Sequence, residues 1–69
     1  MQLSARNQSP ARVTSIKPGE AIANVHLDAN GVEMVASITI EAVQQLGLTE
    51  GSNVTAVIKA SDVILATGD

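Results

Sequence analysis

The segment AIANVHLDANGVEMVASI, residues 21–38, decides how this chain folds. Asn30 and Gly31 lie at its centre, between two runs in which apolar residues alternate with others. An Asn-Gly pair in that setting is the strongest short-range indication of a β-hairpin, because a type I′ turn needs a positive φ at both central residues. The segment therefore predicts two antiparallel strands, residues 21–27 and 32–38, joined by a two-residue turn.

The alternation also assigns the side chains of the hairpin to two faces. Ile22 is an aliphatic residue on the outer face, where its neighbours Asn24 and His26 are polar, so we expect it at a subunit interface. The inward set is Ala21, Ala23, Val25 and Leu27 on the first strand and Val32, Met34, Ala36 and Ile38 on the second.

Upstream of the hairpin, residues 3–16 are rich in small and β-branched types, which predicts one long first strand. Pro10 interrupts it and cannot donate to a ladder, so the strand should contain an edge, a bulge or a bend there. The KPGE segment that follows, residues 17–20, is typical of a turn, because Pro18 presets φ and Gly19 tolerates a positive φ.

Downstream of the hairpin the apolar period changes to that of a helix. Ile40, Val43 and Leu46 fall on one helical face, Thr39 suits the N-cap, and Gly47 stands where a C′ glycine belongs.

After a turn at residues 49–52, a strand is predicted over residues 54–58 and a last short strand over residues 63–66. The predicted order is β-β-β-α-β-β. An all-β chain of five strands, with one short helix between the third and the fourth, describes a small OB-like β-barrel.

The size and composition of the chain predict an oligomer. Its 69 residues suffice for a single domain, residues 1–69, and a domain of this size buries only about 60% of the surface of its unfolded chain. The sequence has no cysteine and no Trp, Tyr or Phe, so disulfides, a Cys-based metal site and large aromatic side chains cannot reinforce the core. Aliphatic side chains suit subunit contacts as well as cores, so we expect obligate association.

Charge and hydropathy patterning argue against two classes of partner. The formal net charge of -3 does not suit a protein that neutralises nucleic-acid phosphates, and the absence of aromatics removes base-stacking platforms. No stretch approaches the roughly 18 apolar residues of a membrane span, and the N-terminus has no signal-peptide pattern. We therefore expect no nucleic-acid or membrane partner and a cytoplasmic location.

Few residues could carry chemistry. His26 is the only histidine, and its expected outward position favours a surface or interface role. The seven carboxylates are scattered, and no nucleophile–base pair or glycine-rich phosphate loop is present, so we predict that the chain is not an enzyme.

What remains is a set of hydrogen-bond donors. Arg6 and Lys59 carry positive charge, Ser4, Thr39 and Ser61 carry hydroxyls, and the start of the predicted helix offers backbone N–H groups. Together they suggest an oxyanion site. The alternative is that these are solvated charges and an ordinary helix cap.

Two stretches, SARN at residues 4–7 and ITIEAVQQLGLTEGSNVTAVIKASDVILA at residues 38–66, are similar to the Mop domain of the molbindins, which are small cytoplasmic molybdate-binding proteins. The resemblance covers essentially the whole chain. It implies binding of molybdate or tungstate without an organic cofactor and without direct protein–metal bonds. It also implies a homohexamer, built as a trimer of dimers, that holds the ions between subunits for molybdenum storage or homeostasis.

The same resemblance implies which residues form the sites. The family often has a hydroxyl residue at the position of Ala42, so the backbone N–H groups of the first helical turn are expected to replace it. The main site comprises Ser4, Ala5 and Arg6 from one subunit and Thr39, Ala42, Lys59, Ala60 and Ser61 from its partner. A second site, near the trimer axis, is placed at the turn formed by Lys17, Gly19, Glu20 and Ala21.

Two other hypotheses remain open at this point. The segment LGLTEGSNV, residues 46–54, also resembles the swapped-hairpin barrels of antitoxins and transition-state DNA-binding regulators. Those proteins need a basic face, whereas this chain has four basic and seven acidic residues. A structural module without a ligand is the remaining alternative.

Overall fold

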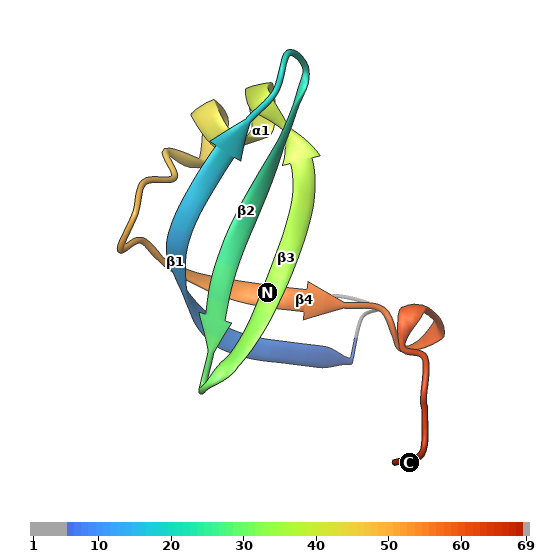
Figure 1. The fold of residues 1–69 in the computed structure, drawn as a ribbon. Helices are drawn as coiled ribbons and strands as arrows, with labels where there is room; N and C mark the ends of the chain where they lie inside the picture. Colours follow the sequence, from blue (N-terminus) through green and yellow to red (C-terminus); the bar gives the residue numbers. More distant parts are fainter. Residues whose placement is uncertain (1–5, 69) are drawn as a thin grey trace.

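In the computed structural model of the chain, the structure describes residues 6–68, and four strands form one antiparallel sheet in the order β3-β2-β1-β4 (Figure 1). A short helix lies between β3 and β4, and a 3₁₀ turn follows β4. The elements are β1 (Asn7–Pro18), β2 (Ile22–Ala29), β3 (Val32–Thr39), α1 (Ile40–Leu46), β4 (Asn53–Ile58) and the 3₁₀ turn η1 (Ala60–Asp62).

The predicted hairpin is confirmed as β2 and β3. Asn30 and Gly31 have φ values of 57° and 91°, as a two-residue turn of this type requires. The backbone N–H of Gly31 also donates to Asp28 Oδ1 at 2.8 Å, which holds the turn from the strand side. The ladder runs from Ala29↔Val32 at the turn to Ile22↔Thr39 at the open end.

β1 is a long, bent strand whose two halves pair with different partners. Residues 12–18 pair with β2 and residues 7–12 pair with β4. The register against β2 shifts between Val13 and Ser15, and such a bulge bends a strand. Pro10 lies in the half of β1 that does not pair with β2. Its missing N–H therefore interrupts no hydrogen bond to β2. The long, bent strand predicted from the sequence is confirmed, but its bulge lies at Val13–Ser15 and not at Pro10, which pairs with Thr55.

Helix α1 begins and ends where its sequence predicts. Thr39 is the N-cap, and its Oγ1 accepts a hydrogen bond from the Ala42 N–H at 3.0 Å. Gly47 ends the helix in the left-handed conformation, with φ of 63°. α1 contacts β2 and β3 and covers one end of the curved sheet (Figure 1). Within residues 6–68 no helix is long and apolar enough to cross a membrane, since α1 has only seven residues.

The core is small and lies on the concave face of the sheet. Val13 and Val25 are 1% exposed, and Ala23 and Leu27 are buried beside them, which confirms Ala23, Val25 and Leu27 of the inward set predicted for β2. Residues at strand ends depart from the prediction, because the adjoining turns leave them uncovered.

Ala21 and Val32 are both exposed, although the alternation predicted that they face inward. Met34, Ala36 and Ile38 are only half-buried, since β3 is an edge strand.

The fifth strand predicted over residues 63–66 is wrong for this chain. Residues 63–68 follow η1 without joining the four-stranded sheet, and Ile64 and Leu65 are 92% and 89% exposed. The prediction rested on the β propensity of an apolar run, but a strand also needs an edge to pair with, and the tail runs away from the sheet (Figure 1). The sheet is therefore open between β3 and β4 rather than closed into a five-stranded barrel.

Candidate oxyanion-binding residues

Arg6 and Lys59 lie at the same end of the β1–β4 pair. Asn7 faces Ile58 in the ladder, so the residue before Asn7 and the residue after Ile58 come next along two adjacent segments. Both side chains are exposed. A guanidinium and an ammonium are thus carried by neighbouring parts of one chain.

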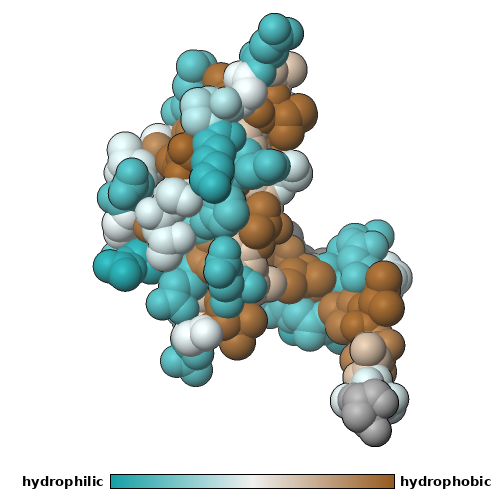
Figure 2. Space-filling view, in the orientation of Figure 1, coloured by the Kyte–Doolittle hydropathy of each residue, from teal (hydrophilic) through white to brown (hydrophobic). Residues whose placement is uncertain are grey.

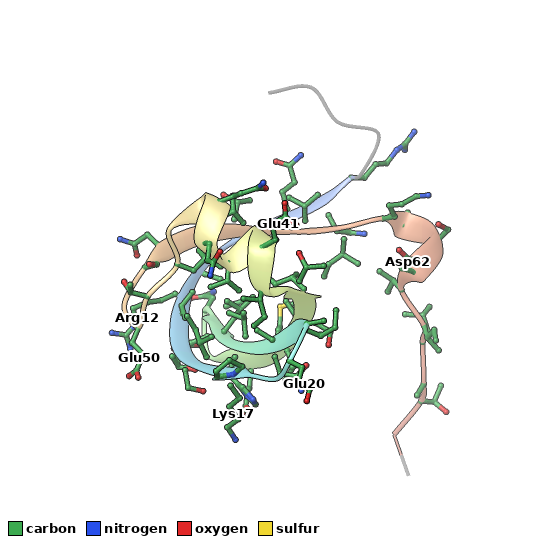
Figure 3. The ribbon with its side chains drawn as sticks, turned by 90° about the horizontal axis from the view of Figure 1, so that it is seen from above. Arg12, Lys17, Glu20, Glu41, Glu50 and Asp62 are labelled. Carbon is green, nitrogen blue, oxygen red and sulfur yellow. The ribbon has the colours of Figure 1, made fainter. Side chains whose placement is uncertain are left out.

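The 3₁₀ turn η1 places the donors of Ala60 and Ser61 at the same end as Arg6 and Lys59. The N–H of Asp62 donates to the Lys59 carbonyl at 2.9 Å, and the N–H of Val63 donates to the Ala60 carbonyl at 3.3 Å. The N–H groups of Ala60 and Ser61 come at the start of the turn, where the turn itself supplies no acceptor. The turn therefore offers a hydroxyl and two backbone donors beside Lys59, together with the carboxylate of Asp62 (Figure 3).

Thr39 is the N-cap of α1 and Ala42 lies in its first turn, next to the turn that follows β1, because Ile40 donates to the Ala21 carbonyl. The first turn of α1 has three N–H groups without an acceptor inside the helix, and two of them donate to other groups of the chain. Ala42 donates to Thr39 Oγ1 at 3.0 Å, and Ile40 donates to the Ala21 carbonyl at 2.8 Å. Of these three N–H groups, only that of Glu41 takes part in neither bond. An oxyanion that used the Ala42 N–H would therefore compete with the N-cap, which the sequence did not indicate.

The turn predicted as a second site lies beside the start of the helix. The N–H of Gly19 donates to the Ile22 carbonyl at 2.8 Å, and the Ala21 carbonyl accepts from Ile40. A Cβ atom on Gly19 would lie 2.9 Å from the Ile22 carbonyl oxygen, so this close approach requires glycine. Lys17 and Glu20 point outward from the same turn (Figure 3).

The structure thus separates the predicted site residues into two groups, which β1 connects. Ser4 and Ala5 lie outside the described residues. The cationic group comprises Arg6, Lys59, Ala60 and Ser61, and the cap group comprises Thr39, Ala42, Lys17, Gly19, Glu20 and Ala21. The sequence could not predict that the second site lies close to Thr39, because this depends on how the β1–β2 turn contacts the start of α1.

The family model of the TOBE domain matches residues 3–65. The chain belongs to the TOBE-domain family. A curated relative, molybdenum-pterin-binding protein 1 of Clostridium pasteurianum, is 41% identical over 66 residues, which are 94% of this chain and 97% of that protein.

Two solved structures of molybdate-binding proteins resemble this TOBE domain closely. A molybdate-binding protein from Sporomusa ovata superposes with a TM-score of 0.93 at 39% identity, over 97% of this chain and all of that one. The cytoplasmic molybdate-binding protein ModG, in a form with molybdate bound, gives a TM-score of 0.88 at 45% identity over 93% of this chain and 46% of its own. The resemblance to Mop proteins predicted from the sequence is confirmed.

One polar cluster of this TOBE domain lies away from the predicted donors. His26 is half-buried on the outer face of β2, as predicted, and its Nδ1 lies 3.3 Å from Glu33 Oε1 on β3. The hydroxyl of Thr14 donates to the His26 carbonyl at 3.2 Å across the bulge of β1. This cluster joins β2 to β3 through His26 and Glu33. Among residues 6–68, no group of His and carboxylate side chains is arranged to hold a metal ion.

Proposed function

We propose that this protein binds molybdate, and with it tungstate, as an intact oxyanion between the subunits of a homohexamer arranged as a trimer of dimers. Its role is the storage and homeostasis of molybdenum in the cytoplasm, without catalysis. The observation that carries the proposal is the full-length match to the Sporomusa ovata molybdate-binding protein. The placement of Arg6 beside Lys59 supports it from the chain's own geometry.

The chemistry of the cationic group suits such an ion. Molybdate and tungstate are tetrahedral dianions whose oxygens accept hydrogen bonds and donate none. Arg6 offers a planar fork that can contact two oxygens at once, while Lys59 offers a point charge, and their two positive charges match the two negative charges of the ion. The Ser61 hydroxyl and the N–H groups at the start of η1 add neutral donors.

A donor-only site also explains the selectivity that we expect. Much of the phosphate near neutral pH carries a proton, and that O–H would face donors without an acceptor, at a cost of about 1–3 kcal/mol. Sulfate is fully deprotonated but smaller, so it is disfavoured because its oxygens do not reach every donor.

The separation of the two groups supports a site shared between chains. The resemblance distributes Arg6 and Lys59 over two subunits, whereas the ladder places them side by side in one chain. We therefore propose that the main site forms where the cationic group of one protomer meets Thr39 and the first turn of α1 of another. The turn around Gly19, which touches that same helix start, provides the second and weaker site.

Titration calorimetry combined with native mass spectrometry tests this function. We expect molybdate and tungstate to bind to a hexamer with comparable affinity, and sulfate and phosphate to bind far more weakly. Duplex DNA is the matched negative control for the alternative of a DNA-binding regulator, and a gel shift should show no complex. A protein that binds none of the four oxyanions would contradict the proposal and leave a structural module as the remaining hypothesis.

A further inference from the structure

The β2–β3 turn carries a chemical motif that the proposed function does not use. Asn30 is followed directly by Gly31, whereas Asn24 and Asn53 each precede a valine. Asn30, Gly31 and the neighbouring Asp28 are all exposed. The turn forms the lower tip of the sheet in Figure 1, and the same region of Figure 2 presents a mostly hydrophilic surface to solvent. The Asn30 side chain and the backbone beside it are therefore open to water.

An asparagine that precedes a glycine can lose ammonia in a reaction within the chain. The backbone nitrogen of the glycine gives up its proton to hydroxide and attacks Cγ of the asparagine. A new N–C bond forms, the C–N bond of the side-chain amide breaks, and the amide nitrogen takes up a proton from water and leaves as ammonia. Water then opens the cyclic imide at one of its two carbonyls, which leaves aspartate or isoaspartate. The only co-reactant is water.

The surroundings of Gly31 leave the attacking nitrogen unhindered. Gly31 has no side chain, and even an added Cβ atom would meet no atom within 4 Å beyond those of its chain neighbours. After Asn24 and Asn53 the next residue is a β-branched valine, whose stiff side chain crowds the nitrogen. The Asn24 amide is also held in place, because its Oδ1 accepts from the Ser37 hydroxyl at 2.6 Å. Of these three asparagines, Asn30 is the one best placed to react.

One hydrogen bond works against the reaction. The N–H of Gly31, whose proton must leave, donates to Asp28 Oδ1 at 2.8 Å. A carboxylate is far too weak a base to remove an amide proton outright, so this charge-assisted bond stabilises the protonated nitrogen. The negative charge of the carboxylate also repels hydroxide and the amide anion that would form. The contact therefore opposes the first step of the reaction.

We propose that Asn30 is a deamidation site of this protein, and that the Asp28 carboxylate slows the reaction through its bond to the Gly31 N–H. The product matters because isoaspartate carries the main chain through its Cβ atom and so adds one backbone atom to a two-residue turn. A turn of fixed length sets the register of its hairpin, here the whole β2–β3 ladder. The inference is independent of the proposed ligand and of the proposed oligomer.

Ageing the intact protein at mildly alkaline pH tests the site, with peptide mapping by mass spectrometry as the readout. Replacement of NH₂ by OH raises the mass of a peptide, and fragmentation locates the change. We expect Asn30 to react about tenfold faster than Asn24 and Asn53, which serve as internal controls. Equal rates at the three positions, or an Asn30 that stays unchanged, would overturn the proposal.

Two variants of the hairpin test the role of Asp28. Asp28→Ala removes the acceptor, so Asn30 should react about three- to tenfold faster than in the parent. Glu33→Ala is the matched control, because Glu33 faces Asp28 in the ladder and has the same charge but contacts His26. It should age as the parent does. An unchanged or slower reaction in Asp28→Ala, or an equal acceleration in both variants, would show that the bond does not restrain Asn30.

Asp28→Asn keeps the test decisive should Asp28→Ala fail to fold, which circular dichroism would reveal. It retains an Oδ1 acceptor without the charge, and a neutral acceptor makes a weaker bond, so Asn30 should react about two- to threefold faster than in the parent. An unchanged or slower reaction would again contradict the role of Asp28.

The effect of isoaspartate on the hairpin has its own measurement. The aged isoaspartate form, separated by ion exchange, should melt about 5 °C below the Asn30→Asp variant, which has the same charge on an ordinary backbone. Equal melting temperatures would show that the extra backbone atom leaves the hairpin intact, and would overturn this part of the inference.

Discussion

The two ends of the molecule are built on different principles. The β2–β3 hairpin is defined by residues adjacent in sequence, since Asn30, Gly31 and the carboxylate of Asp28 form the turn without help from elsewhere. Val63, Ile64 and Leu65 also favour a strand, yet they lie exposed to solvent. Residues close in sequence are sufficient to form a strand pair when both strands belong to the same short segment, as in the β2–β3 hairpin. Where no edge of the sheet lies beside the segment, similar chemistry leaves it exposed and outside the sheet.

The largest expected effect lies at the end of the molecule that carries Arg6 and Lys59. Arg6→Ala should weaken molybdate binding by about 100-fold, because hydrogen bonds to charged groups contribute about 1.5–3 kcal/mol and the fork makes more than one. Arg6→Lys should lose about tenfold, since an ammonium cannot copy the fork. Titration calorimetry measures both.

Arg12→Ala is the control for charge on the same strand, because Arg12 is exposed where β1 changes partners. It should bind molybdate as the parent does. Equal affinities of the parent and Arg6→Ala would remove Arg6 from the site.

The next effect should appear at the hairpin and concern stability alone. Val25→Ala should lower the free energy of unfolding by about 2 kcal/mol, since it removes buried methyl groups and leaves a cavity. Val32→Ala removes the same groups from a 61% exposed position and should change stability by less than about 0.5 kcal/mol. Denaturant titrations at one protein concentration measure both, because oligomers gain stability with concentration. A large loss at Val32 would mean that a partner covers the hairpin too.

A smaller effect tests how much of the hairpin is local. Gly31 has φ of 91°, and a side chain there meets no neighbouring atom within 4 Å, so the cost of Gly31→Ala comes from the backbone conformation. We expect a loss of about 1–2 kcal/mol in the same denaturant assay. Gly68→Ala, at an equally open position without a positive φ, should have no effect. A neutral Gly31→Ala would show that the rest of the sheet, and not the turn, holds the hairpin.

The smallest effect concerns the negative charge of Asp62, at the same end as Arg6 and Lys59. Asp62 lies on η1 beside the cationic group, so its carboxylate opposes an incoming dianion. Asp62→Asn should tighten molybdate binding by about two- to threefold at low salt, and the gain should fade as salt screens the charge. Glu50→Gln is the control, since Glu50 lies on the far side of the molecule (Figure 3). If both substitutions act alike, the effect is one of net charge rather than position.

The elements predicted well from sequence are those whose boundaries are local. Thr39 and Gly47 cap the helix because each acts on residues within one turn of it. The bend of β1 was expected from Pro10, although the register shift itself lies at Val13–Ser15. Sequence reasoning placed the strand at residues 63–66 from propensity, and it could not see that η1 carries those residues away from both free edges.

The candidate site was predicted by residue type and less well by position. Arg6 and Lys59 were identified as donors, but their adjacency follows from the β1–β4 register, which no short sequence pattern encodes. The sequence predicted Thr39 as the N-cap, but an N-cap side chain accepts from the N–H of N2 or N3, so it left open whether the Ala42 N–H is the group that Thr39 Oγ1 engages.

The change of partner within β1 has a consequence for the spacing of the proposed ion sites. One continuous strand of 12 residues connects the cationic group to the turn beside Thr39. A paired strand advances by about 3.3 Å per residue, so its length fixes the distance between the residues at its two ends. A loop of the same length does not fix that distance. In the proposed hexamer, β1 therefore sets the distance between the two half-sites of each chain, and we expect the insertion of one residue in it to shift every proposed ion position together.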